Sequence, residues 1–140
     1  MFSKIVVPVA MDHLDRGEKS LSQAARLLEA GGEIILLNIV EDMMPYVQGY
    51  MVADFPLDML ETSRRVALER LTELKQNSGI DCRLEIRLGG AAGMICGFAQ
   101  DEKADLVIIA SHRPGLSDYF LGSTTERVAR HCKCSVLVER

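Results

Sequence analysis

The chain has 140 residues, which is enough for one domain with a single hydrophobic core and too few for two. Its 48% hydrophobic and 26% charged residues are typical of a folded globular protein and argue against a disordered chain. The net charge of -4 and the lack of any basic run argue against binding to duplex nucleic acid. No apolar run reaches the roughly 20 residues of a membrane helix, and the N-terminus lacks a signal-peptide pattern, so we expect a cytoplasmic protein outside the membrane.

Strand and helix patterns alternate from the N-terminus. The β-branched run 5–9 is typical of a strand buried on both faces, and apolar residues recur at helical spacing over 16–30, up to the pair Gly31-Gly32. A second apolar run, 34–40, predicts the next strand. Residues 43–56 are rich in Met, Tyr and Pro and show no period, which fits a lid, a dimer surface or ordinary loop packing.

The second half of the chain continues the alternation. It contains three helical patterns and three strand patterns, namely helices over 57–78, 91–101 and 123–131 and strands over 82–88, 106–110 and 135–139. The strict alternation of 82–88 predicts one wet face and a place near a sheet edge. Ser123 and Glu126 match a capping box, so we expect Ser123 to cap the last helix.

This order of five strands and four helices predicts a single α/β domain over 1–140, with a parallel sheet and helices on both faces. In such sheets the ligand crevice lies beyond the carboxyl ends of the strands, where the strand order reverses. The two most apolar strands, 5–9 and 106–110, are expected to be central neighbours. The crevice is then floored by Val9-Ala10 and Ala110-Ser111.

The loop 110–125 carries groups that suit a phosphorylated ligand. Gly122-Ser123-Thr124-Thr125 begins the last helix, where unpaired N–H groups and the helix dipole attract anions, and Gly122 has no side chain to block them. His112 and Arg113 add donors, and Arg113 is permanently charged. The alternative is an ordinary capped helix after a surface loop, since neither a Walker A motif nor a Rossmann fingerprint is present.

Several segments together resemble the universal stress protein family. They are Ile5-Val6-Val7-Pro8-Val9, Ala110-Ser111-His112-Arg113-Pro114, Leu121-Gly122-Ser123-Thr124 with Val128 and Arg130-His131, and Cys134-Ser135-Val136-Leu137-Val138. The resemblance covers essentially the whole chain. The loop of this chain is also similar to that of one branch of the family, which reads Ala-Ser-His-Arg-Pro. It implies a five-stranded α/β fold, a homodimer, and in the nucleotide-binding branch ATP held by a Gly-x2-Gly-x9-Gly-Ser/Thr loop.

The resemblance also implies roles for individual residues. It matches Gly122, Ser123, Thr124 and Thr125 to the triphosphate-binding turn, Ile109, Ala110 and His112 to its entry, Pro8, Val9 and Ala10 to the side of adenine and ribose, and Ile39 to a backbone contact with the base. The chain departs from the family motif because Ala110 and Arg113-Pro114 replace the first two glycines. The resemblance to the Ala-Ser-His-Arg-Pro branch implies that Arg113 contacts the phosphates. Ala10 also replaces a family aspartate that is expected to touch the nucleoside.

The sequence therefore predicts a stress-response sensor or adaptor that binds ATP or another adenine nucleotide. We do not expect it to be an enzyme, apart from slow ATP hydrolysis at most. The alternative is a dimeric adaptor without a nucleotide, paired through the strand 135–139, which is expected at a sheet edge. Carboxylates after two strands fit either Mg²⁺ beside the phosphates or a solvated acidic rim; they are Asp12, Asp15, Glu41 and Asp42. The four cysteines lack a metal-site spacing and are expected to be packed, reduced thiols.

Overall fold

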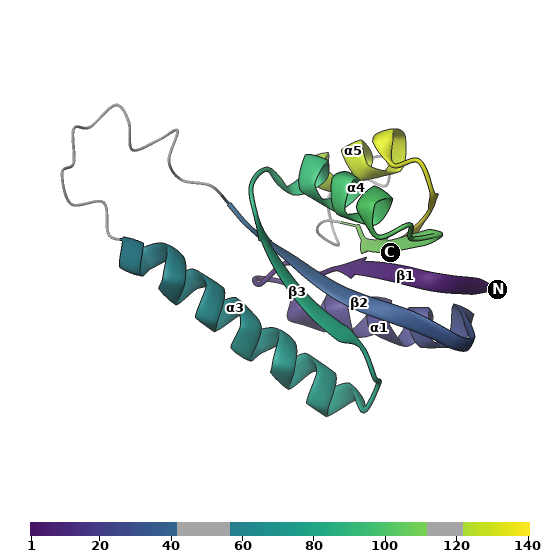
Figure 1. Ribbon diagram of the computed structural model, residues 1–140, viewed down its shortest axis with the longest axis horizontal. Helices are drawn as coiled ribbons and strands as arrows, with labels where there is room; N and C mark the ends of the chain where they lie inside the picture. The colour runs from purple at the N-terminus through teal and green to yellow at the C-terminus, as the bar shows by residue number, and fades with distance from the viewer. Residues whose placement is uncertain (42–56, 112–121) are drawn as a thin grey trace.

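The computed structural model describes residues 1–41, 57–111 and 122–140. The elements in chain order are β1 (Phe2–Pro8), α1 (Leu14–Leu27), β2 (Leu28–Val40), α3 (Leu57–Ser78), β3 (Arg83–Leu88), α4 (Ala91–Asp101), β4 (Leu106–Ala110), α5 (Ser123–His131) and β5 (Ser135–Glu139). The predicted fold class, an α/β domain with a five-stranded parallel sheet, is confirmed (Figure 1). None of the described helices is long and apolar enough to cross a bilayer.

The strands run in the order β3-β2-β1-β4-β5, and every pair is parallel. The central pair, β1 and β4, is joined through Ile5 beside Leu106 and Val6 beside Val107, as the apolar runs predicted. The strand order reverses between these two strands, because the chain moves outward from β1 to β3 on one side and from β4 to β5 on the other. The edge positions of β3 and β5 are also confirmed.

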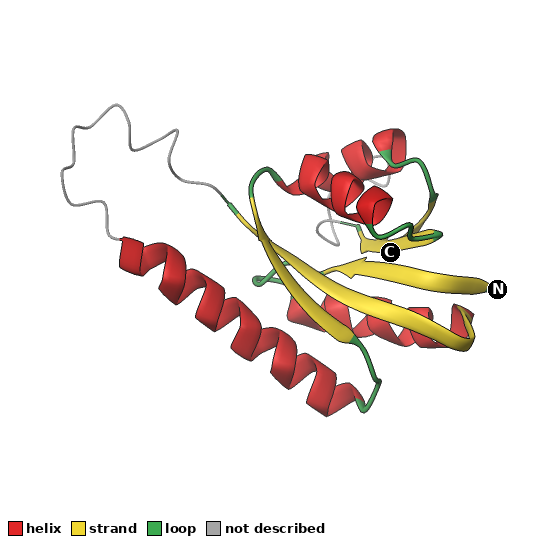
Figure 2. Cartoon of the chain, in the orientation of Figure 1, coloured by secondary structure: helices red, strands yellow, loops and turns green. Residues whose placement is uncertain are grey.

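Helices cover both faces of the sheet, with α1 and α3 on one face and α4 and α5 on the other (Figure 2). Alternate residues of β1 serve the two layers: Ile5 and Val7 pack with Leu21 of α1, whereas Val6 packs with Phe98 of α4. The buried strands are apolar on both sides because each side meets a helix layer.

One predicted boundary is wrong. We expected the first helix to continue to about residue 30 and Gly31 to end it, but α1 ends at Leu27 and β2 begins at Leu28. Gly31 instead adopts a φ of 80° within the strand, where the register with β1 shifts between Phe2 and Lys4. Pairing with β1 overrides the local helical pattern, and only glycine takes this backbone conformation without strain.

Candidate functional site

A cavity of about 250 Å³ lies at the carboxyl edge of the sheet, beyond the ends of β1, β2 and β4. The first turns of α1, α4 and α5 complete its wall. Its lining residues are Pro8, Val9, Ala10, His13, Arg16, Gly17, Leu37, Asn38, Ile39, Ala91, Ile95, Ile109, Ala110, Ser111, Ser123, Thr124 and Thr125. The cavity thus occupies the crevice that the strand order predicts for a ligand.

Most of the candidate residues named from the sequence come together here. Those that line the cavity are Pro8, Val9, Ala10, Ile39, Ile109, Ala110, Ser123, Thr124 and Thr125. Gly122 is buried and directly precedes Ser123 at the start of α5. His112 and Arg113 lie outside the described residues, as do the segment 43–56 and Asp42.

Hydrogen bonds fix the strand ends that floor the cavity. The Val9 N–H donates to the Leu37 carbonyl at 2.8 Å, and the buried Asn38 amide donates from Nδ2 to the Val9 carbonyl at 2.8 Å. On the other side, the Thr125 hydroxyl donates to the Ala110 carbonyl at 2.9 Å. Asn38 and Thr125 are buried, and their hydrogen bonds satisfy the Val9 and Ala110 carbonyls at the floor of the cavity.

The predicted capping box at the start of α5 is wrong. Gly122, not Ser123, is the N-cap, and no side chain of the described residues caps it. The Glu126 N–H donates to the Gly122 carbonyl at 2.9 Å, while the Glu126 side chain pairs with Arg130 at 3.0 Å. The N–H groups of this first turn therefore remain available at the cavity wall, as an anion site requires.

Gly122 is needed for its backbone conformation as well as for its lack of a side chain. Its φ of 91° and ψ of 145° lie where residues with a Cβ are strained. This conformation leads the chain into α5, so that Ser123, Thr124 and Thr125 all reach the cavity wall. The requirement for glycine is therefore built into the entry to the helix.

The first turn of α1 adds residues that sequence reasoning missed. His13, Arg16 and Gly17 line the cavity, and the Arg16 guanidinium donates from Nη1 to the Ser111 carbonyl. A Cβ on Gly17 would lie 2.7 Å from Val9 Cγ1, so glycine lets α1 approach the end of β1 closely. One signal was present in the sequence, because a helix that follows a central strand begins at the same edge where that strand ends.

The charge of the cavity wall favours an anion. Among the residues that the structure describes, His13 and Arg16 are the ionisable side chains of the wall, and none of the lining residues is a carboxylate. Asp12 lies at the surface with Oδ2 3.5 Å from His13 Nε2. Asp12, Asp15 and Glu41 do not line the cavity, and the described part of the chain holds no group of three His, Cys, Asp or Glu side chains suited to a metal ion.

Comparison with known proteins assigns the family. The model of the universal stress protein family matches residues 1–140. The chain belongs to the universal stress protein family. Universal stress protein G of Shigella flexneri is 28% identical over 146 residues, with all of both chains covered.

Solved structures with the same fold agree with this assignment. That of hypothetical protein MJ0577 superposes with a TM-score of 0.79 at 24% identity, over 100% of this chain and 97% of that chain. A universal stress protein solved in complex with cAMP superposes with a TM-score of 0.61 at 22% identity, over 99% of this chain and 97% of that chain. At these identities the superpositions show a shared fold.

Proposed function

We propose that this universal stress protein binds an adenine nucleotide, ATP among them, in the cavity at the carboxyl edge of the sheet. The observation that carries the proposal is that the N-terminus of α5 and the side chains of His13 and Arg16 meet in one cavity. Among the described residues, no side chain caps that terminus and no carboxylate lines the cavity. The solved structure of a family member with cAMP supports an adenine nucleotide as the ligand class.

In this proposal the phosphates lie against the turn 122–125. The N–H groups and hydroxyls of that turn donate to phosphate oxygens, and Arg16 supplies a positive charge from the facing helix. Arg113 and His112 serve the same phosphates, as the family resemblance implies. Because no described carboxylate lines the cavity, any Mg²⁺ that accompanies ATP is held chiefly by the phosphates and water.

The adenine base occupies the apolar part of the wall. Ile39, Ile95 and Ile109 offer aliphatic surface, and Pro8 to Ala10 pass along the edge of the base and ribose. The described residues of the wall provide donors for phosphate and include no carboxylate base to activate water, so we propose binding and not catalysis as the function, with hydrolysis at most slow. The protein then acts as a cytoplasmic stress sensor or adaptor.

A homodimer through β5 completes the proposal. β5 is an edge strand whose outer side has no neighbouring strand in the described sheet, and such an edge favours pairing with a second copy. The outer side of β5 faces away from β4, and the cavity lies at the carboxyl ends of β1 and β4. Pairing through β5 therefore leaves the cavity accessible. The same edge would serve the alternative, an adaptor without a nucleotide.

The experiment is the identification of the nucleotide that copurifies with the protein. The protein is purified without added nucleotide and denatured, and the released small molecules are quantified by absorbance and chromatography against protein concentration. We expect near-stoichiometric ATP or AMP, or, for an empty preparation, a thermal shift with ATP and Mg²⁺ that corresponds to about 2.7 kcal/mol at a hundredfold excess over Kd. If no nucleotide is released and ATP causes no thermal shift, nucleotide binding is contradicted and the adaptor is favoured. Ala10 and Arg113 would then be the sequence changes responsible.

A further inference from the structure

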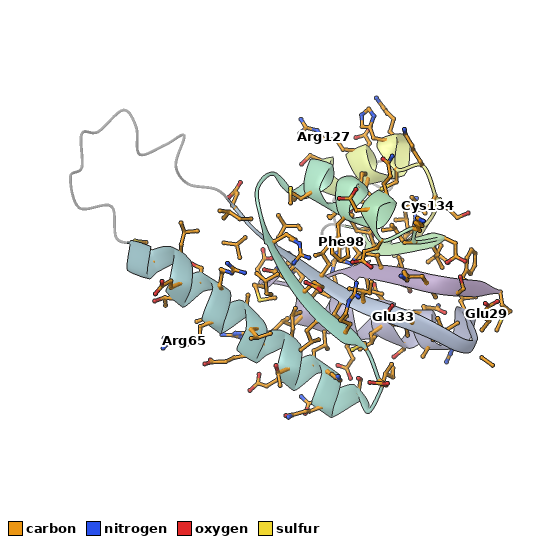
Figure 3. The ribbon with its side chains drawn as sticks, in the orientation of Figure 1. Glu29, Glu33, Arg65, Phe98, Arg127 and Cys134 are labelled. Carbon is orange, nitrogen blue, oxygen red and sulfur yellow. The ribbon has the colours of Figure 1, made fainter. Side chains whose placement is uncertain are left out.

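Three of the four cysteines gather on one face of the sheet. Cys96 lies within α4, Cys132 is the C-cap of α5, and Cys134 follows two residues later beside α4 (Figure 3). All three are partly buried against the core cluster under α4 and α5. Cys82 is buried in the core on the opposite face. Packing, and not spacing along the chain, therefore creates a group of thiols.

A second surface cavity, of about 190 Å³, gives solvent access to this group. Cys96 and Cys134 line it together with Lys103 and Lys133. Lys103 follows the end of α4 with a φ of 55°, a position usually occupied by glycine, and its N–H donates to the Gln100 carbonyl at 3.1 Å. The thiolate is the nucleophile in thiol chemistry, and solvent access lets a dissolved oxidant reach the sulfur.

The thiols also interact with one another. Burial, then a hydrogen bond with Cys96 and the charge of Cys96, raises the pKa of Cys132 far above its usual range. Burial is likewise the main cause that raises the pKa of Cys134, with a smaller contribution from the charge of Cys96. Cys96 and Cys132 pack against the same core cluster, and their helices α4 and α5 contact each other.

We propose that Cys96 and Cys132 form a reversible disulfide when the protein meets a hydroperoxide. Cys96, which lines the open cavity, attacks the peroxide as the thiolate; its sulfur takes one oxygen to become sulfenic acid, and with hydrogen peroxide the other oxygen leaves as water. The Cys132 sulfur then attacks the sulfenic sulfur, the S–S bond forms and a second water leaves. Two thiols lose two electrons and two protons in total, and the peroxide is reduced to two waters.

This disulfide would join the middle of α4 to the end of α5. The two helices pack side by side on one face of the sheet, so the crosslink would join neighbouring helices of the same layer (Figure 1). Cys134 is separated from Cys132 by one residue only, which makes a bond between those two the strained alternative. The proposal depends on the packing of α4 against α5 and not on nucleotide binding.

Trypsin separates the three thiols, so peptide mapping tests the pairing directly. Cleavage after Arg and Lys places Cys96 in peptide 88–103, Cys132 in 131–133 and Cys134 in 134–140. The reduced protein is treated with one equivalent of hydrogen peroxide, blocked with N-ethylmaleimide and digested without reductant. We expect the oxidised protein to be lighter by two hydrogen atoms before blocking, and the digest to contain a linked pair of peptides 88–103 and 131–133 that dithiothreitol releases. Alkylation of both Cys96 and Cys132, or a link from 88–103 to 134–140, would overturn the assigned pair.

Variants provide the matched controls. Cys96→Ser removes the nucleophile and should abolish the intramolecular bond, whereas Cys82→Ser, on the opposite face, should leave its yield unchanged. Oxidation of the native protein should also become faster between pH 7 and pH 9, since the thiolate attacks the peroxide. An equal yield in Cys96→Ser would overturn the proposal. If that variant fails to fold, the peptide map of the wild-type protein still decides whether Cys96 and Cys132 pair.

Discussion

The two ends of the parallel strands carry different kinds of polar groups. The amino edge is the side of the sheet where the strands begin, and the carboxyl edge is the side where they end. At the amino edge, Lys4, Glu33, Arg83 and Glu102 belong to an ion cluster, which Glu85 joins at 3.4 Å from Arg83 Nε. Arg83 Nη2 lies 2.7 Å from Glu102 Oε2 and its Nη1 3.4 Å from Glu33 Oε1, while Lys4 Nζ lies 3.6 and 3.7 Å from the same two carboxylates. At the carboxyl edge, the Arg16 guanidinium and helix N–H groups face a cavity whose described lining residues include no carboxylate.

Asp105 completes the amino edge. Its two carboxylate oxygens accept hydrogen bonds from the Ser3 N–H and the Lys4 N–H, each at 2.9 Å, and another from the Ser3 hydroxyl at 3.1 Å. Burial alone would raise the pKa of Asp105, but these hydrogen bonds outweigh it and hold the pKa below its usual value. The carboxylate thereby ties the start of β4 to the start of β1.

The comparison separates stability from binding. Polar groups of the amino edge find partners within the chain, so changes there should alter the free energy of unfolding and leave ligand affinity alone. At the carboxyl edge, the N–H groups at the start of α5 lie at the cavity wall and are available to a ligand, so changes there should alter affinity first. Substitutions at each edge can test this separation.

The largest effect is expected for Gly122→Glu. The substitution strains a backbone with φ of 91° and places a carboxylate at the proposed phosphate site, so ATP should bind at least about 100-fold more weakly, or about 2.7 kcal/mol. Isothermal titration calorimetry measures the change. Gly79→Glu is the matched control, because Gly79 also has a positive φ, 67°, and a Cβ there meets open space. Equal affinity in Gly122→Glu and wild type would contradict the site.

The second effect is expected for Asp105→Asn. The amide turns an NH2 group toward a backbone donor, which should lower the free energy of unfolding by about 2 kcal/mol at pH 7. Because the folded pKa lies below the unfolded value of about 3.9, the stabilisation is complete above that pH and is lost as the pH falls through the folded pKa. Denaturant unfolding at pH 7 and below pH 4 tests this: the gap between variant and wild type should close in acid.

Two controls sharpen the test of Asp105. Asp101→Asn changes an exposed carboxylate at the end of α4 and should cost less than about 0.5 kcal/mol. Nucleotide affinity of Asp105→Asn should equal that of wild type, since the residue lies at the opposite edge from the cavity. A gap that persists at low pH, or a loss of affinity, would contradict the division between the two edges.

The smallest effect is expected for Glu102→Gln in the ion cluster. A hydrogen bond from Arg83 is the first cause that lowers the pKa of Glu102, but both side chains are partly exposed, so the loss should be at most about 1 kcal/mol. The loss should shrink in 1 M NaCl, where the screening length is about 3 Å. Glu69→Gln, which breaks an exposed pair with Arg65, is the control and should change almost nothing. A larger and salt-independent loss would show that packing, not charge, holds the cluster.

Much of the fold was predictable because local patterns determine it. The continuous apolar runs of β1 and β4 require burial on both faces and hence central positions, and the alternation in β3 requires an edge. The capping box failed because Gly122 is the N-cap of α5 and the Glu126 side chain pairs with Arg130. Pairing with a neighbouring strand likewise moved the end of α1 to Leu27.

The sequence by itself determined the order of elements, the crevice at the strand ends and the start of α5 as a candidate phosphate site, since each depends on residues close together along the chain. Only the tertiary structure decided that Arg16 and Asn38 reach the same cavity, and that Cys96 and Cys132 pack against one core cluster. Side-chain neighbours from distant segments depend on the packing of helices on the sheet. No periodicity or spacing in a single sequence encodes that geometry directly.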